Sequence, residues 1–259
     1  MIIAILVFIV GTIIGSFLNV CIHRIPKSQS VVSPRSRCPQ CGAPIKWYDN
    51  IPIVSFCILR GRCRSCKLPI SRRYLLVEAI TGLILLALFL AFGLSPKFLA
   101  YSVLSAGLIV ATFIDFAERT IPDHITVTGL VLGPLFSVGF PDIMGRAMRI
   151  QALVDSLLGI LAGGIVMYFV GAVGKFLFEK EAMGEGDAFL MAMIGAFLGW
   201  KLTLLAFFIA PFFGLVHGIK VKLQGNEEYV PYGPYLSMAA LAAIFFGDKI
   251  LAFVFRGIL

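Results

Sequence analysis

The stretch MGEGDAFLMAMIGAFLGW, residues 183–200, places a carboxylate directly before an apolar run. Gly184 and Gly186 precede Asp187, and thirteen hydrophobic or small residues follow it. Asp187 is therefore predicted to lie where a membrane-crossing segment begins. Moving an ionised carboxylate to the bilayer centre costs about 2.5–3.5 kcal/mol on insertion scales, so such a residue is a functional candidate.

Similar apolar runs recur along the whole chain of 259 residues, which is 59% hydrophobic and 14% charged, with a mean hydropathy of +0.95. This composition excludes a soluble protein. A helix needs about 20 apolar residues to cross about 30 Å of hydrocarbon. We therefore expect an all-α polytopic membrane protein with about eight transmembrane helices, at 2–22, 75–93, 98–116, 124–140, 153–174, 188–200, 202–218 and 233–255.

Two of these runs have unusual features. The first, residues 2–20, lacks a basic start and a small-residue cleavage site, so we interpret it as a retained span and not as a signal peptide. The sixth, residues 188–200, reaches only about 20 Å as a helix at 1.5 Å per residue. It is separated from the seventh only around Gly199, Trp200 and Lys201. We expect either a short span or a tilted hairpin here.

The polar segment 23–73 sets the orientation, because it holds eleven of the twenty-two Lys and Arg residues and only one acid, Asp49. The positive-inside rule places this segment in the cytoplasm. Counting spans outward from it, Asp115 ends a helix and Asp187 begins one at the same cytoplasmic face. The net charge of +8 then reports orientation and contact with anionic lipid. We expect the lipid bilayer as a partner and no nucleic acid, since no nucleic-acid module is visible.

Two carboxylates at one depth are suited to hydrolysing an amide. One must be ionised to activate water, and the other must be protonated to polarise the carbonyl oxygen. Carboxylates that share a site cannot both ionise easily, which favours this division. We predict Asp115 and Asp187 as the catalytic pair, with Gly184 and Gly186 positioning the substrate backbone. The alternative is that each Asp merely ends its helix at the interface.

Other acidic residues leave further alternatives open. Asp123, in IPD before the fourth span, rivals Asp115 for the catalytic role, although Pro-Asp is also an ordinary helix start. Glu78, near Arg72 and Arg73, is either part of an intramembrane ion pair or a functional group. Five glutamates lie in the two loops that flank the sixth and seventh spans, namely Glu179, Glu181, Glu185, Glu227 and Glu228. They are candidates to bind a basic segment of the substrate, and the alternative is a solvated charged face.

The polar segment contains two cysteine pairs, Cys38-x2-Cys41 and Cys63-x2-Cys66, separated by twenty-one residues. Their surroundings repeat, with CPQCGAPI matching CRSCKLPI. Four thiolates bind zinc tetrahedrally and leave no open position, so we predict a structural zinc ion, with a redox dithiol pair as the alternative. We expect Cys21 and Cys57 to be buried as small hydrophobic residues. The predicted domains are a first transmembrane helix (1–22), a cytoplasmic zinc-binding loop (23–74) and a transmembrane peptidase domain (75–259).

Several motifs in one order resemble those of the bacterial type IV prepilin peptidases, the leader peptidase/N-methyltransferases among the membrane aspartic proteases with a GxGD motif. The resemblance covers nearly the whole chain and rests on GSFLNVCIHRIP, the paired CxxC loop with WYDNIP, RRYLLVEAITG, IDFAERTIPD, GEGD and PYGPYL. The chain departs from the family pattern at Leu75, where proline is expected, and at Ala117, where some members carry an acid.

The resemblance implies an inner-membrane aspartic endopeptidase whose catalytic residues match Asp115 and Asp187. It also implies cleavage, at the cytoplasmic face, of the short basic leader of type IV prepilins and type II secretion pseudopilins. Methylation of the new amino terminus with S-adenosylmethionine is implied as well, but no motif indicates where this methyl donor binds. The alternatives are a proton-coupled transporter with the two Asp residues as a relay, and a GxGD protease for other membrane substrates.

Overall fold

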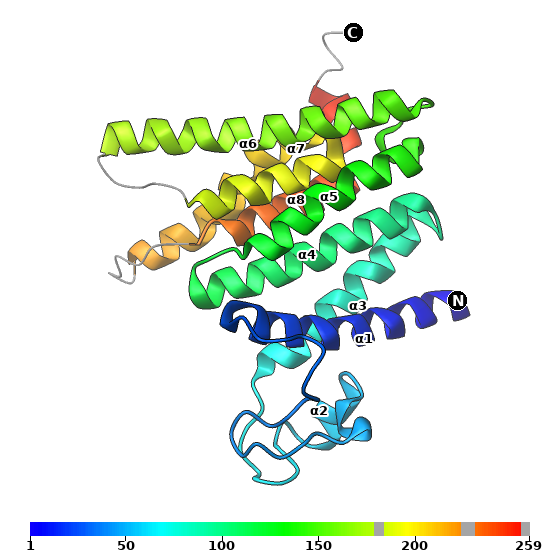
Figure 1. The fold of residues 1–259 in the computed structure, drawn as a ribbon, viewed down its shortest axis with the longest axis vertical. Coiled ribbons are helices and arrows are strands. Elements are labelled where there is room, and N and C mark those ends of the chain that lie inside the picture. Colours follow the sequence, from blue (N-terminus) through cyan, green and yellow to red (C-terminus); the bar gives the residue numbers. More distant parts are fainter. Residues whose placement is uncertain (179–183, 224–230, 255–259) are drawn as a thin grey trace. The chain divides into compact units, whose positions relative to one another are not determined.

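The computed structural model describes residues 1–178, 184–223 and 231–254, with no side chains described for residues 178 and 216–223 (Figure 1). This part of the chain is almost entirely helical and contains no β-strand; two isolated β-bridges lie in the cysteine loop. The prediction of an all-α fold is confirmed. The helices divide into two compact units, residues 1–94 and 95–259.

The first unit holds two long helices joined by the cysteine loop. Helix α1 spans Ile2–Arg24 and helix α3 spans Arg72–Phe92. Glycines let them approach closely, because a Cβ atom at Gly11 would lie only 2.7 Å from the Cα of Gly82. Between them the loop contains three short helical turns, η1 (Ile25–Lys27), η2 (Trp47–Asn50) and α2 (Val54–Ile58).

The second unit is a helical bundle. Its elements are α4 (Pro96–Glu118), α5 (Asp123–Gly139), the short η3 (Pro141–Met144), α6 (Arg149–Phe178), α7 (Glu185–Leu223) and α8 (Gly233–Val254). Local signals set the helix starts. For example, the Ser95 hydroxyl accepts the Phe98 N–H at 3.2 Å, and Pro96 follows this cap. In sequence α4 and α8 are far apart, yet they pack together, as do α6 and α7.

Each predicted membrane span falls on a helix of the structure. Within the described residues, six helices are long and apolar enough to cross a membrane. Helix α5, with 17 residues, is shorter than these six. The sixth and seventh predicted spans both lie in α7, whose helical backbone is interrupted at Gly199 with φ 71° and ψ 169°. Glycine adopts this conformation readily, so the break falls where the sequence predicted one.

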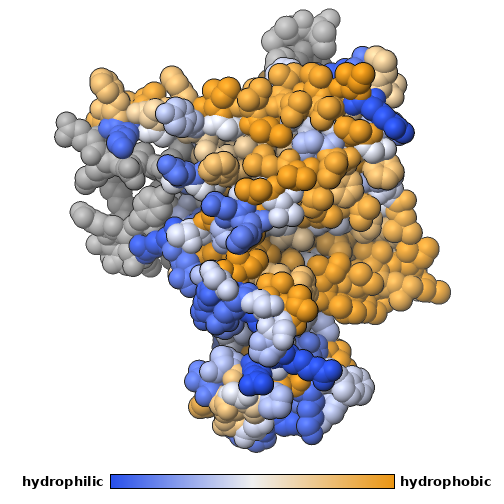
Figure 2. All heavy atoms as spheres, viewed as in Figure 1, coloured by the Kyte–Doolittle hydropathy of each residue, from blue (hydrophilic) through white to orange (hydrophobic). Residues whose placement is uncertain are grey.

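The helices present apolar side chains outward as well as inward. Phe176, Phe208 and Phe212 are 86%, 66% and 73% exposed. Figure 2 shows hydrophobic residues over most of the visible helical surface of the second unit. Soluble monomers rarely expose apolar patches of this kind, so lipid is the solvent that matches this surface. The chain is a multi-pass membrane protein.

Helix α7 is held against α6 by backbone contact. A Cβ atom on Gly195 would collide with the carbonyl of Gly159 in α6, and one on Gly159 would collide with the carbonyl of Gly195. Such small-residue contacts are the usual way in which transmembrane helices approach each other.

We predict that Gly195→Ala destabilises the bundle by about 1–3 kcal/mol, because the added methyl group forces α6 and α7 apart. The measurement is the thermal unfolding midpoint in detergent. Gly139→Ala, at the end of α5, is the matched control, since nothing lies within 4 Å of its added Cβ. An unchanged midpoint for Gly195→Ala would contradict the packing described here.

Candidate active site and metal centre

Asp115 lies in the last turn of α4 and is only 5% exposed. The helix ends three residues later, at Glu118. The next residue, Arg119, adopts a left-handed backbone conformation (φ 56°) and donates its N–H to the Asp115 carbonyl at 2.9 Å. The end of a helix carries a partial negative charge, which disfavours a carboxylate there. Asp115 therefore needs donors from another element.

The start of α8 supplies such a donor. The first N–H groups of a helix have no partner within the helix, and the N–H of Gly233 donates to Asp115 Oδ2 at 3.1 Å. A Cβ atom at residue 233 would lie 2.7 Å from the same carboxylate oxygen. Glycine is thus required at this position for the hydrogen bond to form. The carboxylate also faces the positive end of the α8 dipole.

Asp187 is the third residue of α7 and is also 5% exposed. Its Oδ2 accepts the N–H of Gly184 at 3.3 Å, and its own N–H donates to the Gly184 carbonyl at 3.1 Å. These two bonds close a turn at the start of α7. The second buried carboxylate therefore also lies at the N-terminus of a helix.

Ile121, in the connection between α4 and α5, brings the two helix starts together. A Cβ atom on Gly186 would lie 3.1 Å from Ile121 Cβ, and one on Gly233 would lie 3.0 Å from Ile121 Cδ1. Asp115 and Asp187 are close enough for their charges to interact directly. The two carboxylates, seventy-two residues apart in sequence, thus belong to one site in the second unit.

Tyr232 lies beside this pair, directly before α8. Burial and the negative charge of Asp187 raise the pKa of Tyr232 to about 12. The phenol consequently keeps its proton at any physiological pH and remains a hydrogen-bond donor. Its backbone carbonyl accepts the N–H groups of Tyr235 and Leu236 at 3.0 and 3.2 Å, which fixes the first turn of α8.

The other acidic candidates lie elsewhere or point outward. Asp123 is exposed at the start of α5, and Glu185 is exposed at the start of α7. Within the described residues, Glu78 forms no ion pair with Arg72 or Arg73; it accepts the Ile53 N–H at 2.8 Å instead. The remaining members of the acidic set lie outside the described residues; they are Glu179, Glu181, Glu227 and Glu228.

Two site residues were not singled out from the sequence, namely Gly233 and Ile121. In the sequence, Gly233 stands out only as part of the motif PYGPYL. A glycine followed by proline does mark a helix start, and helix starts attract carboxylates. Which carboxylate it meets depends on the packing of α8 against α4, which the sequence does not show.

The cysteine loop forms the second candidate site. The sulfur atoms of Cys38, Cys41, Cys63 and Cys66 all lie within 4.8 Å of one another. The two pairs adopt the same turn: the Cys38 N–H donates to the Ala43 carbonyl at 2.9 Å, and the Cys63 N–H donates to the Leu68 carbonyl at 2.9 Å. The repeat seen in the sequence is therefore a structural repeat.

This geometry fits a metal ion. Four sulfurs about 2.3 Å from a central ion in a tetrahedron are about 3.8 Å apart, and the Cys38 and Cys66 sulfurs are 4.0 Å apart. No thiol in the described chain is paired as a disulfide. Cys21 is buried as expected, whereas the same prediction for Cys57 is wrong, because its short helix α2 lies at the surface.

We predict that the purified protein carries one tightly held metal ion and that Cys38→Ser or Cys63→Ser lowers the metal content severalfold, because serine is a poor ligand for a soft site. The measurement is elemental analysis by mass spectrometry. Cys57→Ser should retain the metal, since Cys57 lies outside the cluster. Full metal retention after loss of Cys38 would exclude this centre.

The fold and the two sites together define a class: a polytopic membrane protein with a buried carboxylate pair and a four-cysteine cluster that can hold a metal ion. Two family descriptions match the chain, the "Bacterial Peptidase A24 N-terminal domain" over residues 9–92 and the "Type IV leader peptidase family" over residues 102–219. The chain belongs to the type IV leader peptidase family.

Curated relatives agree with this assignment. Proteins named "Prepilin leader peptidase/N-methyltransferase" are 36% identical in Aeromonas hydrophila and 32% identical in Pseudomonas aeruginosa, covering 95% and 93% of this chain and 91% and 90% of the relatives. A protein of the same name in Myxococcus xanthus is 41% identical over 85% of this chain, which spans only 63% of that relative. No solved structure matches the chain.

Proposed function

We propose that this protein is a membrane-embedded aspartic endopeptidase that cleaves the basic leader from type IV prepilins and type II secretion pseudopilins. The observation that carries the proposal is the meeting of Asp115 and Asp187 in one buried site, in a chain that belongs to the leader peptidase family. The proposed location is the cytoplasmic face of the bacterial inner membrane, because the basic segment 23–73 favours that orientation.

In the proposed reaction one Asp is ionised and takes a proton from water, whose oxygen adds to the scissile carbonyl carbon. The other Asp is protonated and donates to the carbonyl oxygen. Collapse of the tetrahedral intermediate breaks the C–N bond, and the leaving amine takes up the proton held by the first Asp. One hydroxyl of the intermediate returns its proton to the second Asp as the new carboxyl group forms, which restores the pair. Mutual repulsion between two buried carboxylates supports their sharing one proton.

The glycines before Asp187 have different proposed parts. Gly184 is exposed, so its backbone is open to a substrate chain. Gly186 contacts Ile121, and a side chain there would press against the loop that joins the two Asp helices. We propose Gly184 as the position that the substrate backbone approaches. Gly186 positions the substrate only indirectly, through Ile121.

We further propose that zinc fills the four-cysteine centre, with its ligands Cys38, Cys41, Cys63 and Cys66, and that its role is structural. Four thiolates complete a tetrahedral shell and leave no position for water or substrate. The second proposed activity is methylation of the new amino terminus with S-adenosylmethionine, supported by the name that the relatives share. The domain division at residues 22 and 74 remains a prediction.

The first test is cleavage of a substrate with a basic leader ending in glycine before an apolar helix. Asp115→Asn and Asp187→Asn should each lower the rate at least 100-fold, because asparagine keeps the size but cannot exchange a proton. Asp123→Asn is the control, since Asp123 is exposed. Near-normal cleavage by either buried variant would overturn the pairing.

Two further measurements separate the peptidase from the alternative functions. A proton relay for transport would place its carboxylates near the membrane midplane, whereas Asp115 and Asp187 lie at helix ends. Proton uptake by vesicles that contain Asp115→Asn tests the relay directly. Cleavage of unrelated membrane helices as fast as the prepilin substrate would favour a GxGD protease of broader specificity.

A second prediction concerns Gly233. Gly233→Ala should reduce cleavage at least tenfold, because the added methyl group would displace the Asp115 carboxylate from the α8 N-terminus. Gly107→Ala in α4 is the matched control, with its nearest neighbour 3.6 Å from the added Cβ. Normal cleavage by Gly233→Ala would show that the Gly233 bond to Asp115 is dispensable.

A further inference from the structure

The cysteine loop carries apolar side chains on its outer surface, at the two short helical elements η2 and α2. Trp47 in η2 is 80% exposed, and Ile58 and Val54 in α2 are 70% and 48% exposed. Cys57 is exposed between them. Val54, Cys57 and Ile58 are three and four residues apart, so they lie on one side of α2. We call these four residues the outer face; an exposed apolar surface of this kind marks an interaction site.

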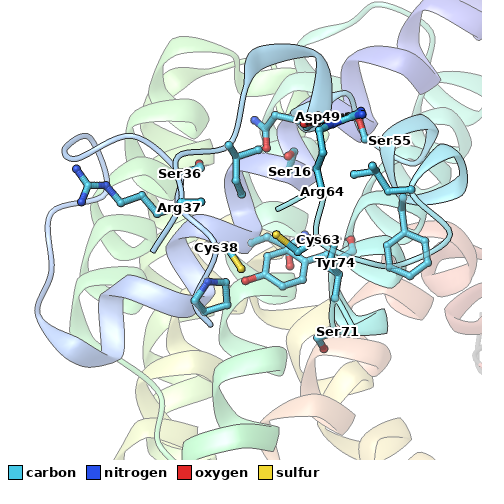
Figure 3. A pocket seen from close by; sticks show the side chains of 18 of the residues that line it. Ser16, Ser36, Arg37, Cys38, Asp49, Ser55, Cys63, Arg64, Ser71 and Tyr74 are labelled. Atoms are coloured by element: carbon cyan, nitrogen blue, oxygen red, sulfur yellow. Dashed lines mark hydrogen bonds and ion pairs between the residues drawn. The ribbon is translucent and has the colours of Figure 1, made fainter. Parts of the chain in front are cut away.

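The opposite side of α2 faces a cavity of about 620 Å³ inside the first unit. The end of α1, both cysteine turns, η2 and the start of α3 also contribute to the walls of this cavity (Figure 3). From α2, Ser55 and Phe56 line the cavity, whereas none of the four residues of the outer face does. The outer face is therefore turned away from the interior of the loop and is open to a partner outside it.

A hydrogen bond fixes the level of α2 along the membrane-crossing helix α3. The N–H of Ile53, directly before α2, donates to Glu78 Oε2 at 2.8 Å. Glu78 lies six residues after Arg72, the first residue of α3, which is about 9 Å along the helix axis. The apolar part of α3 has already begun there, at Leu75. The loop thus folds back along α3 to the level at which this helix enters the hydrocarbon.

The outer face stays close to this level. Helix α2 has only five residues and is about 7.5 Å long, so none of it lies far from Ile53. The Ser55 hydroxyl donates to the Tyr48 carbonyl at 2.9 Å, which ties η2, and with it Trp47, to α2. Apolar side chains at the depth of the lipid headgroups meet acyl chains and not bulk water, so their exposure is favourable there.

Basic side chains border the outer face. Arg60 and Arg62 follow α2 directly, and both are exposed and do not line the cavity. The N–H of Arg60 donates to the Cys57 carbonyl at 3.1 Å, which keeps Arg60 at the end of α2. Positive charge beside an apolar surface is complementary to the phosphates of anionic lipids.

The one acid of segment 23–73, Asp49, does not offset this charge at the outer face. Arg64 donates to both carboxylate oxygens of Asp49, at 2.6–3.0 Å, so that this acid is already paired (Figure 3). The net positive charge also disfavours the basic leader of a prepilin as the occupant of this surface. Tryptophan is the residue type most typical of the headgroup level, and Trp47 is the most exposed member of the outer face.

We propose that the outer face lies in the headgroup region of the same bilayer that α1 and α3 cross. Trp47, Val54 and Ile58 contact the upper part of the acyl chains, and Arg60 and Arg62 bind anionic lipid phosphates. The cysteine loop is then attached to the membrane at three places, namely α1, α3 and the outer face. It is held against the bilayer surface and does not move freely in the aqueous phase.

The test uses the fluorescence of Trp47 in the full-length protein. The chain has two tryptophans, so Trp200→Phe leaves Trp47 as the only one. In bilayers of phosphatidylglycerol brominated high on the acyl chains, emission should fall at least twofold relative to unbrominated lipid. Bromines at the chain ends should quench less, because the outer face is shallow. Aqueous iodide should quench little, and retained metal content shows that the loop is folded.

The other outcomes overturn the proposal. Quenching by iodide and not by brominated lipid would place Trp47 in water. Quenching by neither would show that protein covers the outer face, either a second copy or another part of this chain.

Paired substitutions test the charged part of the surface. Arg60→Gln with Arg62→Gln should reduce the quenching by brominated phosphatidylglycerol, because the attraction to lipid phosphates is lost. Arg35→Gln with Lys67→Gln is the matched control, since it removes two exposed positive charges elsewhere in the loop. Unchanged quenching in the first pair, or an equal loss in both pairs, would contradict the lipid contact of Arg60 and Arg62.

Discussion

Two carboxylates are buried at the ends of helices, and the second unit depends on how they are stabilised there. Burial removes the water that would otherwise solvate them, and their proximity adds repulsion. Each is therefore placed against a helix N-terminus: Asp187 within the first turn of its own helix, and Asp115 at the start of α8. The C-terminal end of α4 carries a partial negative charge, which disfavours the carboxylate of Asp115. The N-terminus of the neighbouring helix α8 is therefore needed to stabilise it.

The helix packing maintains this arrangement. Glycine contacts hold α7 against α6, and Ile121 closes the connection between α4 and α5 over both helix starts. None of these residues carries charge or reactive chemistry. They hold the elements that carry the two carboxylates, and the proposed sharing of a proton depends on how closely these carboxylates approach each other.

Much of this arrangement follows from sequence, for identifiable reasons. Long apolar runs predict the helices because a bilayer permits few other structures, and the glycine at 199 marks the break within α7. The repeated cysteine spacing predicts the cluster because both halves of the repeat form the same local turn. The sequence does not show the tertiary contacts. These include the hydrogen bond from Gly233 to Asp115, the position of Ile121 between the starts of α7 and α8, and the exposure of Cys57 in a helix of five residues.

The repeated cysteine turns also bear on how the loop folds. Each turn spans only a few residues, so each can form early and on its own. Joining them requires closing the twenty-one-residue stretch between Cys41 and Cys63. The loss of chain entropy on closing a loop of that length costs about 3 kcal/mol. A metal that binds both turns supplies this closure in one step. Because the walls of the cavity include both turns, metal uptake would then precede the formation of any ligand site in the first unit.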